Sequence, residues 1–481
     1  MGIIIVGLGP GDPTQITREA WQVLSEAEEV YLRTRRHPAV PHLPPHLRVH
    51  SFDHVYEERA HYAEIYAAIA EEILALGQRP IGVVYAVPGH PCVGEATTSL
   101  IAAEARARGM PLRIVAGLSF VEAACAALGL DPLERGLQVA DAMLIARQHH
   151  PALEADRPAI LGQIASRALA SDVKLTLMNL YPDDHEVTVV QRAGLPDQRL
   201  IRLPLYELDR AVEFDDLTAL YVPPLAGPCS FTALQEVVAH LRAPDGCPWD
   251  REQTHQSLRS DLLEETYEVL DALDAEDTAA LREELGDLLL HVAMHTQIAT
   301  EEGEFRLPDV AVGIADKLIR RHPHVFGEAP VKDQAEILRN WEAIKRRERS
   351  DNGGEAGSLL DGIPKTLPAL AQAQAYLGRA ARVGLGIVAD EERYATVERA
   401  LRALRAGEKG SEERLTEALF ALAALARGRG VDAEAALRGL NAKFAARVAR
   451  AEALAQEAGQ DLSALTQKEQ ADWWNRAGED A

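Results

Sequence analysis

The pattern of hydrophobic residues changes once along the chain, near residue 225, and this change constrains the fold more than any other feature. Before it, short β-branched runs alternate with helical periodicity and with glycine and proline turns, which is typical of an α/β region. The consecutive prolines Pro223 and Pro224 end this region, because two prolines continue neither a strand nor the interior of a helix. The predicted strands are residues 3–6, 81–87, 112–115, 175–180, 186–190 and 219–222.

From residue 231 onward the pattern is almost wholly helical. A polar, glycine-rich stretch at 350–358 is typical of a linker. Residues 283–297 resemble residues 413–427, and each segment precedes a lysine-containing helix and then a tryptophan. This similarity indicates an internal duplication. We therefore predict three domains, at residues 1–227, 231–349 and 358–481.

The chain of 481 residues carries a formal net charge of -24, from 50 basic and 74 acidic side chains. An acidic excess of this size argues against polymeric nucleic acid and anionic membranes as partners, because both are held through Lys and Arg. Small phosphorylated ligands are compatible with it, since divalent cations bridge phosphates to carboxylates. The composition therefore favours a small-molecule partner over a polymer.

Three observations predict a soluble, cytoplasmic protein. No run of eighteen apolar residues occurs, and the first residues, MGIIIVGLGPGDP, show neither the basic segment nor the cleavage site of a secretory signal. The cysteines have unrelated spacings, so they form no CxxC pair and no disulfide framework. They are Cys92, Cys125, Cys229 and Cys247.

Residues 262–298 predict two helices joined near 275–278, with Asp277 or Thr278 capping the second. Acidic residues recur three apart on each helix, and residues three apart share a helix face. When Glu276 is the centre of an antiparallel hairpin, each acidic residue on the first helix lies level with one on the second. The four carboxylates of this square are Glu265, Glu268, Glu284 and Asp287.

Four neighbouring carboxylates repel one another, so a positive charge is needed to offset them. Mg²⁺ and Mn²⁺ prefer oxygen-only ligands, and Mg²⁺ retains water molecules that can act as a nucleophile. A solvated acidic face is the alternative and is the usual explanation of a single ExxE pair. Two such pairs in mirrored register favour the metal site.

Basic and aromatic residues near the hairpin in sequence could bind the phosphates and the base of a ligand. An ordinary solvated helix face is the alternative for the basic group at 317–321, and a core position is the alternative for Trp249. Trp249 belongs to a CPWD motif at 247–250, which is followed by QTH and has no chemistry evident from the sequence. The other basic and aromatic candidates are Lys317, Arg320, Arg321, Trp341, Lys345 and Arg346.

The strings CPWDREQTHQSLRSDLLEETYEVLDAL, ELGD, KLIRRHPHVFG and NWEAIK resemble MazG-type nucleoside triphosphate pyrophosphohydrolases, and they cover nearly all of residues 231–349. The resemblance implies an all-α, four-helix-bundle-like, usually oligomeric enzyme that binds Mg²⁺ through ExxE and ExxD pairs. It also implies hydrolysis of a nucleoside triphosphate to the monophosphate and pyrophosphate, by attack of water on the α-phosphorus. The implied catalytic metal ligands are Glu265, Glu268, Glu284 and Asp287. The implied substrate-binding residues are Trp249, Lys317, Arg320, Arg321, Trp341 and Lys345.

The second helical unit also resembles this family, most clearly at residues 358–374. Alignment of the two copies places Arg414 opposite Glu284 and Glu417 opposite Asp287, and no clear EExxE precedes them. A cation at the position of a metal ligand opposes metal binding. We therefore predict that this degenerate copy is inactive and serves packing, dimerisation or regulation.

Three glycine-rich turns follow predicted strands in the α/β region, within residues 7–13, 83–95 and 116–130. Open α/β sheets bind ligands at such turns, because the turns lie at the carboxyl ends of the strands. The first turn does not match the dinucleotide fingerprint GxGxxG, since Asp12 takes the place of the third glycine. Asp12 is the only candidate for a general base, and a turn or helix-cap role is its alternative.

These turns, with TLMNLY at 176–181 and a length near 225 residues, resemble the tetrapyrrole methylase family of S-adenosylmethionine-dependent enzymes that act on corrins and porphyrinoids. The resemblance implies two α/β subdomains with the methyl donor in the cleft between them. His90 departs from the commoner form of the family, which has Asp there. The implied donor-binding residues are Pro10, Gly89, His90, Val93, Ser119, Phe120 and Met178, with Gly194 a weaker candidate.

The complete layout resembles the fused YabN-type proteins: a methylase-like domain, one intact MazG-like unit and one degenerate copy. One hypothesis is a homodimeric enzyme with two activities, which uses Mg²⁺ or Mn²⁺ for hydrolysis and S-adenosylmethionine for methylation of a tetrapyrrole or another acceptor. The alternative is a non-catalytic methylase-like module that senses S-adenosylmethionine or a partner and regulates the hydrolase.

Overall fold

The computed structural model describes residues 2–58, 61–210, 213–327, 358–386 and 388–479, together with isolated residues between 328 and 357. The chain forms two compact units, Met1–Val237 and Val238–Ala481. Among the described residues, no helix combines the length and the apolar character that crossing a bilayer requires. The predicted linker at 350–358 lies almost entirely outside the described residues, and the predicted domain boundaries stay a prediction.

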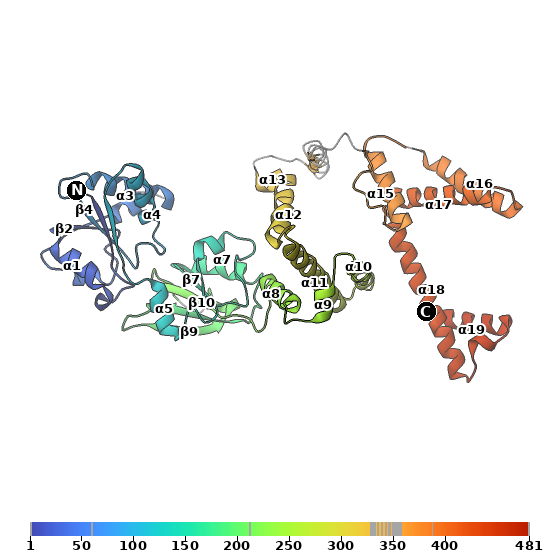
Figure 1. The fold of residues 1–481 in the computed structure, drawn as a ribbon, viewed down its shortest axis with the longest axis horizontal. Helices are drawn as coiled ribbons and strands as arrows, with labels where there is room; N and C mark the ends of the chain where they lie inside the picture. Colours follow the sequence, from blue (N-terminus) through green and yellow to red (C-terminus); the bar gives the residue numbers. More distant parts are fainter. Residues whose placement is uncertain are drawn as a thin grey trace. The chain divides into compact units, whose positions relative to one another are not determined.

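The first unit begins with a parallel five-stranded sheet in the order β3-β2-β4-β1-β5 (Figure 1). Apolar residues of α3 (Tyr62–Leu76) and α4 (Ala96–Ala107) pack on one face, and those of α1 (Arg18–Glu26) pack on the other. The carboxyl ends of the central strands therefore meet at one edge of the sheet. The strands are β1 (Ile3–Gly7), β2 (Glu29–Leu32), β3 (Arg48–Ser51), β4 (Val83–Val87) and β5 (Leu112–Val115).

A second five-stranded sheet follows in the order β6-β7-β10-β8-β9, with mixed strand directions. Helix α5 (Phe120–Leu128) precedes it, and α6 (Ala142–Ala146) and α7 (Arg167–Leu177) lie among its strands in sequence. The two sheets agree with the predicted pair of α/β subdomains. The strands are β6 (Gln138–Asp141), β7 (Ala159–Gly162), β8 (Glu186–Gln191), β9 (Arg199–Pro204) and β10 (Thr218–Val222).

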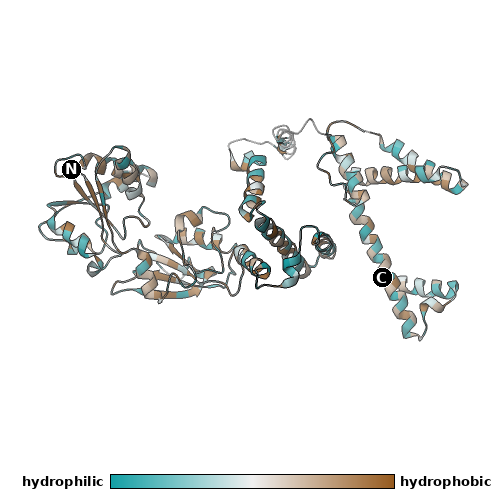
Figure 2. Ribbon diagram, viewed as in Figure 1, coloured by the Kyte–Doolittle hydropathy of each residue, from teal (hydrophilic) through white to brown (hydrophobic). Residues whose placement is uncertain are grey.

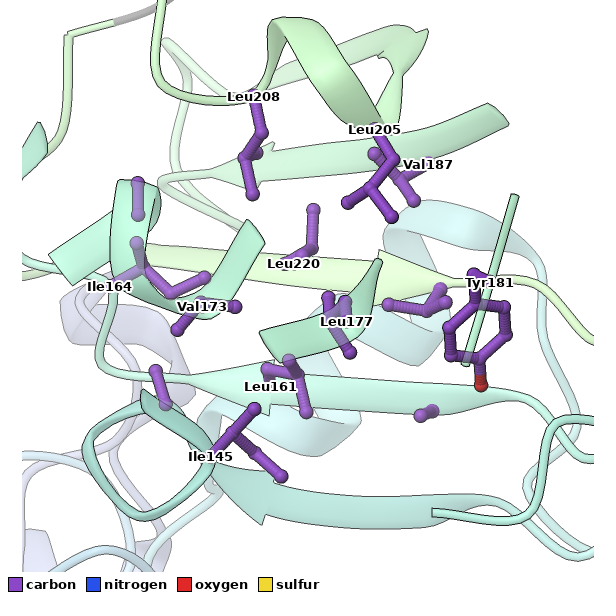
Figure 3. Packing of buried hydrophobic residues seen from close by; sticks show 14 of the residues in the cluster. Ile145, Leu161, Ile164, Val173, Leu177, Tyr181, Val187, Leu205, Leu208 and Leu220 are labelled. Atoms are coloured by element: carbon purple, nitrogen blue, oxygen red, sulfur yellow. The ribbon is translucent and has the colours of Figure 1, made fainter. Parts of the chain in front are cut away.

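The predicted strand at residues 175–180 is wrong, because these residues form the end of α7 and the turn after it. Figure 3 shows the reason: Val173 and Leu177 of α7 point toward Leu161 and Leu220 on the strands. Val173 and Leu177 are spaced for one helix face, so a helix buries both against the sheet. Residues 175–180 alone fit a strand, because the helical spacing becomes visible only when Val173 is included.

The second unit is helical, which confirms the predicted fold class of an α/β region followed by an all-α region. Its first part contains an antiparallel hairpin of α10 (Arg259–Asp274) and α11 (Thr278–Glu302). The preceding helices are α8 (Phe231–Arg242), which begins in the first unit, and α9 (Pro248–Glu252). The following helices are α12 (Leu307–Arg321) and α13 (Pro323–Phe326).

The second part of this unit is built around another hairpin, formed by α16 (Asp390–Ala406) and α17 (Ser411–Gly428). Small residues line the contact, with Ala400, Ala403, Ala421 and Ala424 all buried, so the two helices approach closely. The remaining helices are α15 (Ala369–Arg382), α18 (Ala433–Glu457) and α19 (Gln467–Glu479).

Candidate functional site

The hairpin of α10 and α11 brings three of the four predicted carboxylates together, and Asp287 is not part of that close group. Asp277 caps α11 by accepting hydrogen bonds from the backbone amides of Ala279 and Ala280 at 2.9 and 3.0 Å, as one of the two predicted caps. Carboxylate oxygens of Glu265, Glu268 and Glu284 lie within 4.8 Å of one another.

The electrostatics of this cluster follow the predicted register. The pKa of Glu265 is raised, first by partial loss of hydration and next by the charge of Asp287, its level partner. The pKa of Glu284 is raised by the same loss of hydration and then by Glu268. The charges of neighbouring carboxylates thus add to the effect of lost hydration in raising both pKa values. Three clustered carboxylates on two helices fit Mg²⁺ or Mn²⁺.

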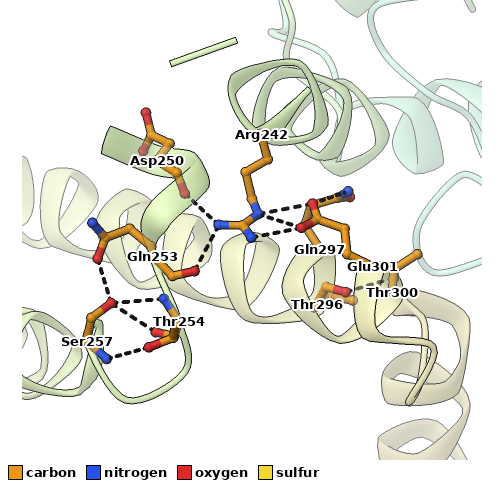
Figure 4. A network of polar contacts seen from close by, with 9 residues as sticks. All are labelled: Arg242, Asp250, Gln253, Thr254, Ser257, Thr296, Gln297, Thr300 and Glu301. Carbon is orange, nitrogen blue, oxygen red and sulfur yellow. Dashed lines mark hydrogen bonds and ion pairs between the residues drawn. The ribbon is translucent and has the colours of Figure 1, made fainter. Parts of the chain in front are cut away.

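A polar network fastens the segment before the hairpin to α11 (Figure 4). The guanidinium of Arg242 on α8 donates to the carboxylate of Glu301 on α11, with nitrogen–oxygen distances of 2.8 to 3.2 Å. It also donates to the backbone carbonyls of Asp250 and Gln253. The Arg242 side chain is only 6% exposed. Its hydrogen bonds to the two carbonyls hold the CPWD and QTH motifs in place. The sequence alone did not reveal this role.

A histidine pair adds a second link between the same segments. The Nδ1 atoms of His255 and His295 lie 2.8 Å apart and their rings are nearly parallel. His255 precedes α10, and His295 belongs to α11, so the pair joins the base of the hairpin beyond the carboxylates. Burial lowers the pKa of His295, and the neighbouring His255 lowers it further.

The predicted phosphate-binding residues form a separate set of contacts. Arg320 and Arg321 at the end of α12 both pair with Glu348, at 2.7 and 2.5 Å. These arginines hold the pKa of Glu348 down to about 2. The guanidinium of Arg321 also lies 5.6 Å from the ring centre of Trp341.

The other predicted substrate-binding residues have different surroundings. Lys317 is half-buried on α12, and Trp249 on α9 is 61% exposed. Lys345 lies outside the described residues. The substrate-binding roles of all these residues stay predictions.

The three glycine turns meet at the carboxyl ends of β1, β4 and β5. Gly9 and Gly89 exchange two backbone hydrogen bonds, of 2.8 and 3.2 Å. A Cβ atom on Gly7 would lie 2.6 Å from the carbonyl oxygen of Gly89, and one on Gly117 would lie 2.4 Å from it. Only glycine fits this close approach. These packed turns, which we call the glycine cradle, lie at the carboxyl ends of the strands, where open α/β sheets bind ligands.

Residues of the second subdomain contact the glycine-rich turns of the first. The amide of Gln163, which follows β7, donates to the carbonyl of Gly94 at 2.8 Å. A Cβ atom on Gly11 would contact the side chain of Leu195, and one on Gly194 would contact Gln15. The two subdomains thus contact each other around the cradle, as the resemblance to the methylases implies.

Several residues predicted to bind the methyl donor have local structural roles. Ser119 caps α5 through a reciprocal hydrogen-bond pair with Glu122. Phe120 packs against Gly162 of β7. The Nδ1 atom of His90 accepts a hydrogen bond from the amide of Cys92 at 3.0 Å.

The remaining predicted residues divide between the turns and the second sheet. Pro10 and Val93 lie partly buried in the first and second turns. Met178 ends α7 and packs on the core of the second sheet. Asp12 caps a short 3₁₀ turn through Thr14, so its alternative role as a cap is the one observed.

A buried ion pair beside the cradle was not predicted from the sequence. Arg33, directly after β2, pairs with Glu95 at 2.6 Å and donates to the hydroxyl of Tyr56. Glu95 also accepts a hydrogen bond from the hydroxyl of Thr97 at 2.6 Å. Because breaking a buried pair leaves a charge uncompensated, this contact fixes the loop that carries Gly89 and Val93.

His37 lies against the backbone of Gly9 and is 4% exposed. Burial lowers its pKa from 6.5 to about 4. The unfolded chain therefore takes up a proton near pH 6.5 that the folded chain accepts only near pH 4, so acid destabilises the fold. Between pH 7 and pH 4.5 we expect the wild-type first unit to lose about 2.5 kcal/mol more folding free energy than His37→Gln.

Hydrogen exchange of the β1 and β4 amides measures this difference in folding free energy. The experiment uses the full chain across urea concentrations at pH 7 and pH 4.5. His42→Gln removes an exposed histidine and is the matched control, which should behave as wild type. Equal acid losses in wild type and His37→Gln would contradict the assignment.

Comparison with known proteins matches the two halves of the chain to two different families. Residues 2–209 match the Tetrapyrrole (Corrin/Porphyrin) Methylases, and residues 253–326 match the MazG nucleotide pyrophosphohydrolase domain. The chain is 38% identical over 488 residues to the uncharacterised protein YabN of Bacillus subtilis (strain 168). The alignment covers 99% of this chain and 98% of that protein. The chain belongs to the YabN family.

Two further relatives concern the C-terminal half of this YabN-family chain. A nucleoside triphosphate pyrophosphohydrolase of Escherichia coli (strain K12) is 40% identical over 252 residues, which cover 50% of this chain and 95% of that protein. The nucleoside triphosphate pyrophosphohydrolase/pyrophosphatase MazG of Thermotoga maritima (strain ATCC 43589 / DSM 3109 / JCM 10099 / NBRC 100826 / MSB8) is 37% identical over 249 residues, which cover 51% of this chain and 95% of that protein. The predicted MazG-type hydrolase class is confirmed.

Proposed function

We propose that the first hairpin of this YabN-family protein hydrolyses nucleoside triphosphates to monophosphates and pyrophosphate. The observation that carries the proposal is the carboxylate cluster of α10 and α11, whose members Glu265, Glu268 and Glu284 lie within 4.8 Å of one another. The charge of Asp287, the level partner of Glu265, raises the pKa of Glu265, and we assign Asp287 as the fourth ligand. Membership of the MazG family supports the reaction type.

The carboxylates hold Mg²⁺ or Mn²⁺ in this proposal. When bound, such an ion lowers the pKa of water and neutralises charge on the phosphates. Arg320 and Arg321 receive the phosphate chain in place of Glu348, because guanidinium groups bind carboxylate and phosphate in the same bidentate geometry. The hairpin of α10 and α11 holds the carboxylates in place during the reaction.

Metal removal tests this proposal. We expect the full chain to consume nucleoside triphosphates with Mg²⁺, to stop in EDTA, and to recover on addition of Mg²⁺ or Mn²⁺ but not Ca²⁺. Chromatography of the products from a panel of ribo-, deoxy- and damaged nucleoside triphosphates measures their consumption. Undiminished turnover in EDTA would overturn the role of the carboxylates.

The glycine cradle supports binding of S-adenosylmethionine by the first unit. The close backbone packing of Gly7, Gly89 and Gly117 holds the three turns together at the carboxyl ends of the strands, where open α/β sheets bind ligands. When bound, the cofactor supplies a methyl group on a sulfonium centre, and the cradle aligns it. Repeating the nucleotide panel with the cofactor separates a sensing role, which changes hydrolysis, from an independent methyl transfer to a tetrapyrrole or another acceptor.

Exposed apolar residues support the predicted association of two copies. On α11, Leu285, Leu289 and Val292 are between 42% and 47% exposed and recur at helical spacing. Figure 2 shows hydrophobic residues along this helix. Burying such a stripe against a second copy removes it from water. Light scattering of the full chain should therefore give about twice the chain mass of 52.4 kDa.

A further inference from the structure

A cavity of about 370 Å³, open to solvent on one side, lies between α16 and α17 of the second helical hairpin. Its lining includes three arginines, Arg399, Arg402 and Arg414, together with the carboxylates Glu408 and Glu417. The basic groups outnumber the acidic ones here, although the chain as a whole is strongly acidic.

These residues repeat the spacing of the carboxylate cluster in the first hairpin, but closer to the turn. Arg399 and Arg402 stand three apart on α16, and Arg414 and Glu417 stand three apart on α17. Arg402 and Arg414 are each six residues from Glu408, and Arg399 and Glu417 are each nine residues from it. The first hairpin has its acidic pairs eight and eleven residues from Glu276, so the second hairpin has a similar mirrored arrangement nearer its turn, with arginine at three of the four positions.

The guanidinium groups are only partly neutralised. Arg414 pairs with Glu408. Arg402 has a 3.5 Å ion pair with Glu398, in which both side chains are about 70% exposed, so solvent screens it strongly. Arg399 donates to the hydroxyl of Thr396 at 3.0 Å, and no ion pair is found for it among the described residues.

We propose that this hairpin binds the polyphosphate group of a small phosphorylated ligand without a metal ion. Three guanidinium groups present planar pairs of donors that match phosphate oxygens. In the first hairpin, carboxylates need a cation between themselves and a phosphate. In the second, the arginines contact the phosphates directly. The cavity volume lies within the usual range for small-ligand sites.

This proposal predicts binding under conditions in which the first hairpin is silent. Calorimetry of the full chain with inorganic pyrophosphate in excess EDTA should show one bound pyrophosphate per chain. Glu265→Gln with Glu268→Gln should bind equally well, because that pair of substitutions alters only the first hairpin. Absence of pyrophosphate binding by the wild-type chain in EDTA would overturn the proposal.

Substitution of the arginines locates the site. Arg399→Gln with Arg402→Gln should weaken pyrophosphate binding in EDTA at least tenfold. Arg405→Gln, on the same helix but outside the cavity lining, removes one charge and is the matched control with wild-type affinity. If both variants lose affinity equally per charge removed, the ion is held by general surface charge and the site assignment is wrong.

Discussion

Glu268→Gln is expected to lower the rate of nucleoside triphosphate hydrolysis about 100-fold or more, because it removes a charged metal ligand. Glu268 neighbours both Glu265 and Glu284 in the cluster. Glutamine has the same shape but no net charge, so it weakens the metal site while keeping the helix intact. Initial rates at saturating Mg²⁺ measure the effect.

Glu264→Gln is the matched control for this experiment. Glu264 is the preceding residue on α10 and is exposed, so its substitution changes the net charge equally without touching the cluster. We expect Glu264→Gln to retain the wild-type rate within about twofold. Similar rates for Glu268→Gln and Glu264→Gln would show that the cluster is a solvated acidic face, the alternative that the sequence left open.

Gly117→Ala is expected to abolish binding of S-adenosylmethionine and to destabilise the first unit by about 1 to 3 kcal/mol. Its new methyl group would lie 2.4 Å from the carbonyl oxygen of Gly89 and 3.0 Å from the Cα atom of Gly7. Both neighbours are backbone atoms, so the turns themselves have to separate. Calorimetric titration with the cofactor measures binding, and urea unfolding measures stability.

The control is Gly439→Ala on α18, where a Cβ atom would have no neighbour within 4 Å. In a helix interior this change should stabilise by about 1 kcal/mol and leave cofactor binding unchanged. Hydrolysis by Gly117→Ala should also persist, which shows that the loss is confined to the first unit. Wild-type cofactor affinity in Gly117→Ala would contradict the proposed cradle.

The carboxylate cluster was predictable because its geometry is local. A helical hairpin with its turn at Glu276 leaves little freedom in which residues lie level, so spacing alone pairs Glu265 with Asp287. The glycine turns were predictable for a similar reason, since each follows a strand directly. In both cases the residues that meet are positioned by elements whose ends the sequence marks.

Contacts between segments distant in sequence were not predictable. Arg242 contacts Glu301 across 59 residues, and Arg33 contacts Glu95 across 62. Nothing in the spacing of single charged residues indicates such a partner. The error at residues 175–180 has another physical origin, because a short apolar run fits a strand or the end of a helix until its packing against a sheet is known.

The identity of the products distinguishes pyrophosphohydrolysis from every other cleavage of a nucleoside triphosphate. Full-length protein is incubated with Mg²⁺ and a nucleoside triphosphate, and the products are resolved by chromatography and phosphorus magnetic resonance. We expect monophosphate and pyrophosphate in equal amounts from the wild-type chain, and both products at a rate about 100-fold lower from Glu268→Gln. Diphosphate with inorganic phosphate, or no consumption of any nucleotide in the panel, would contradict it.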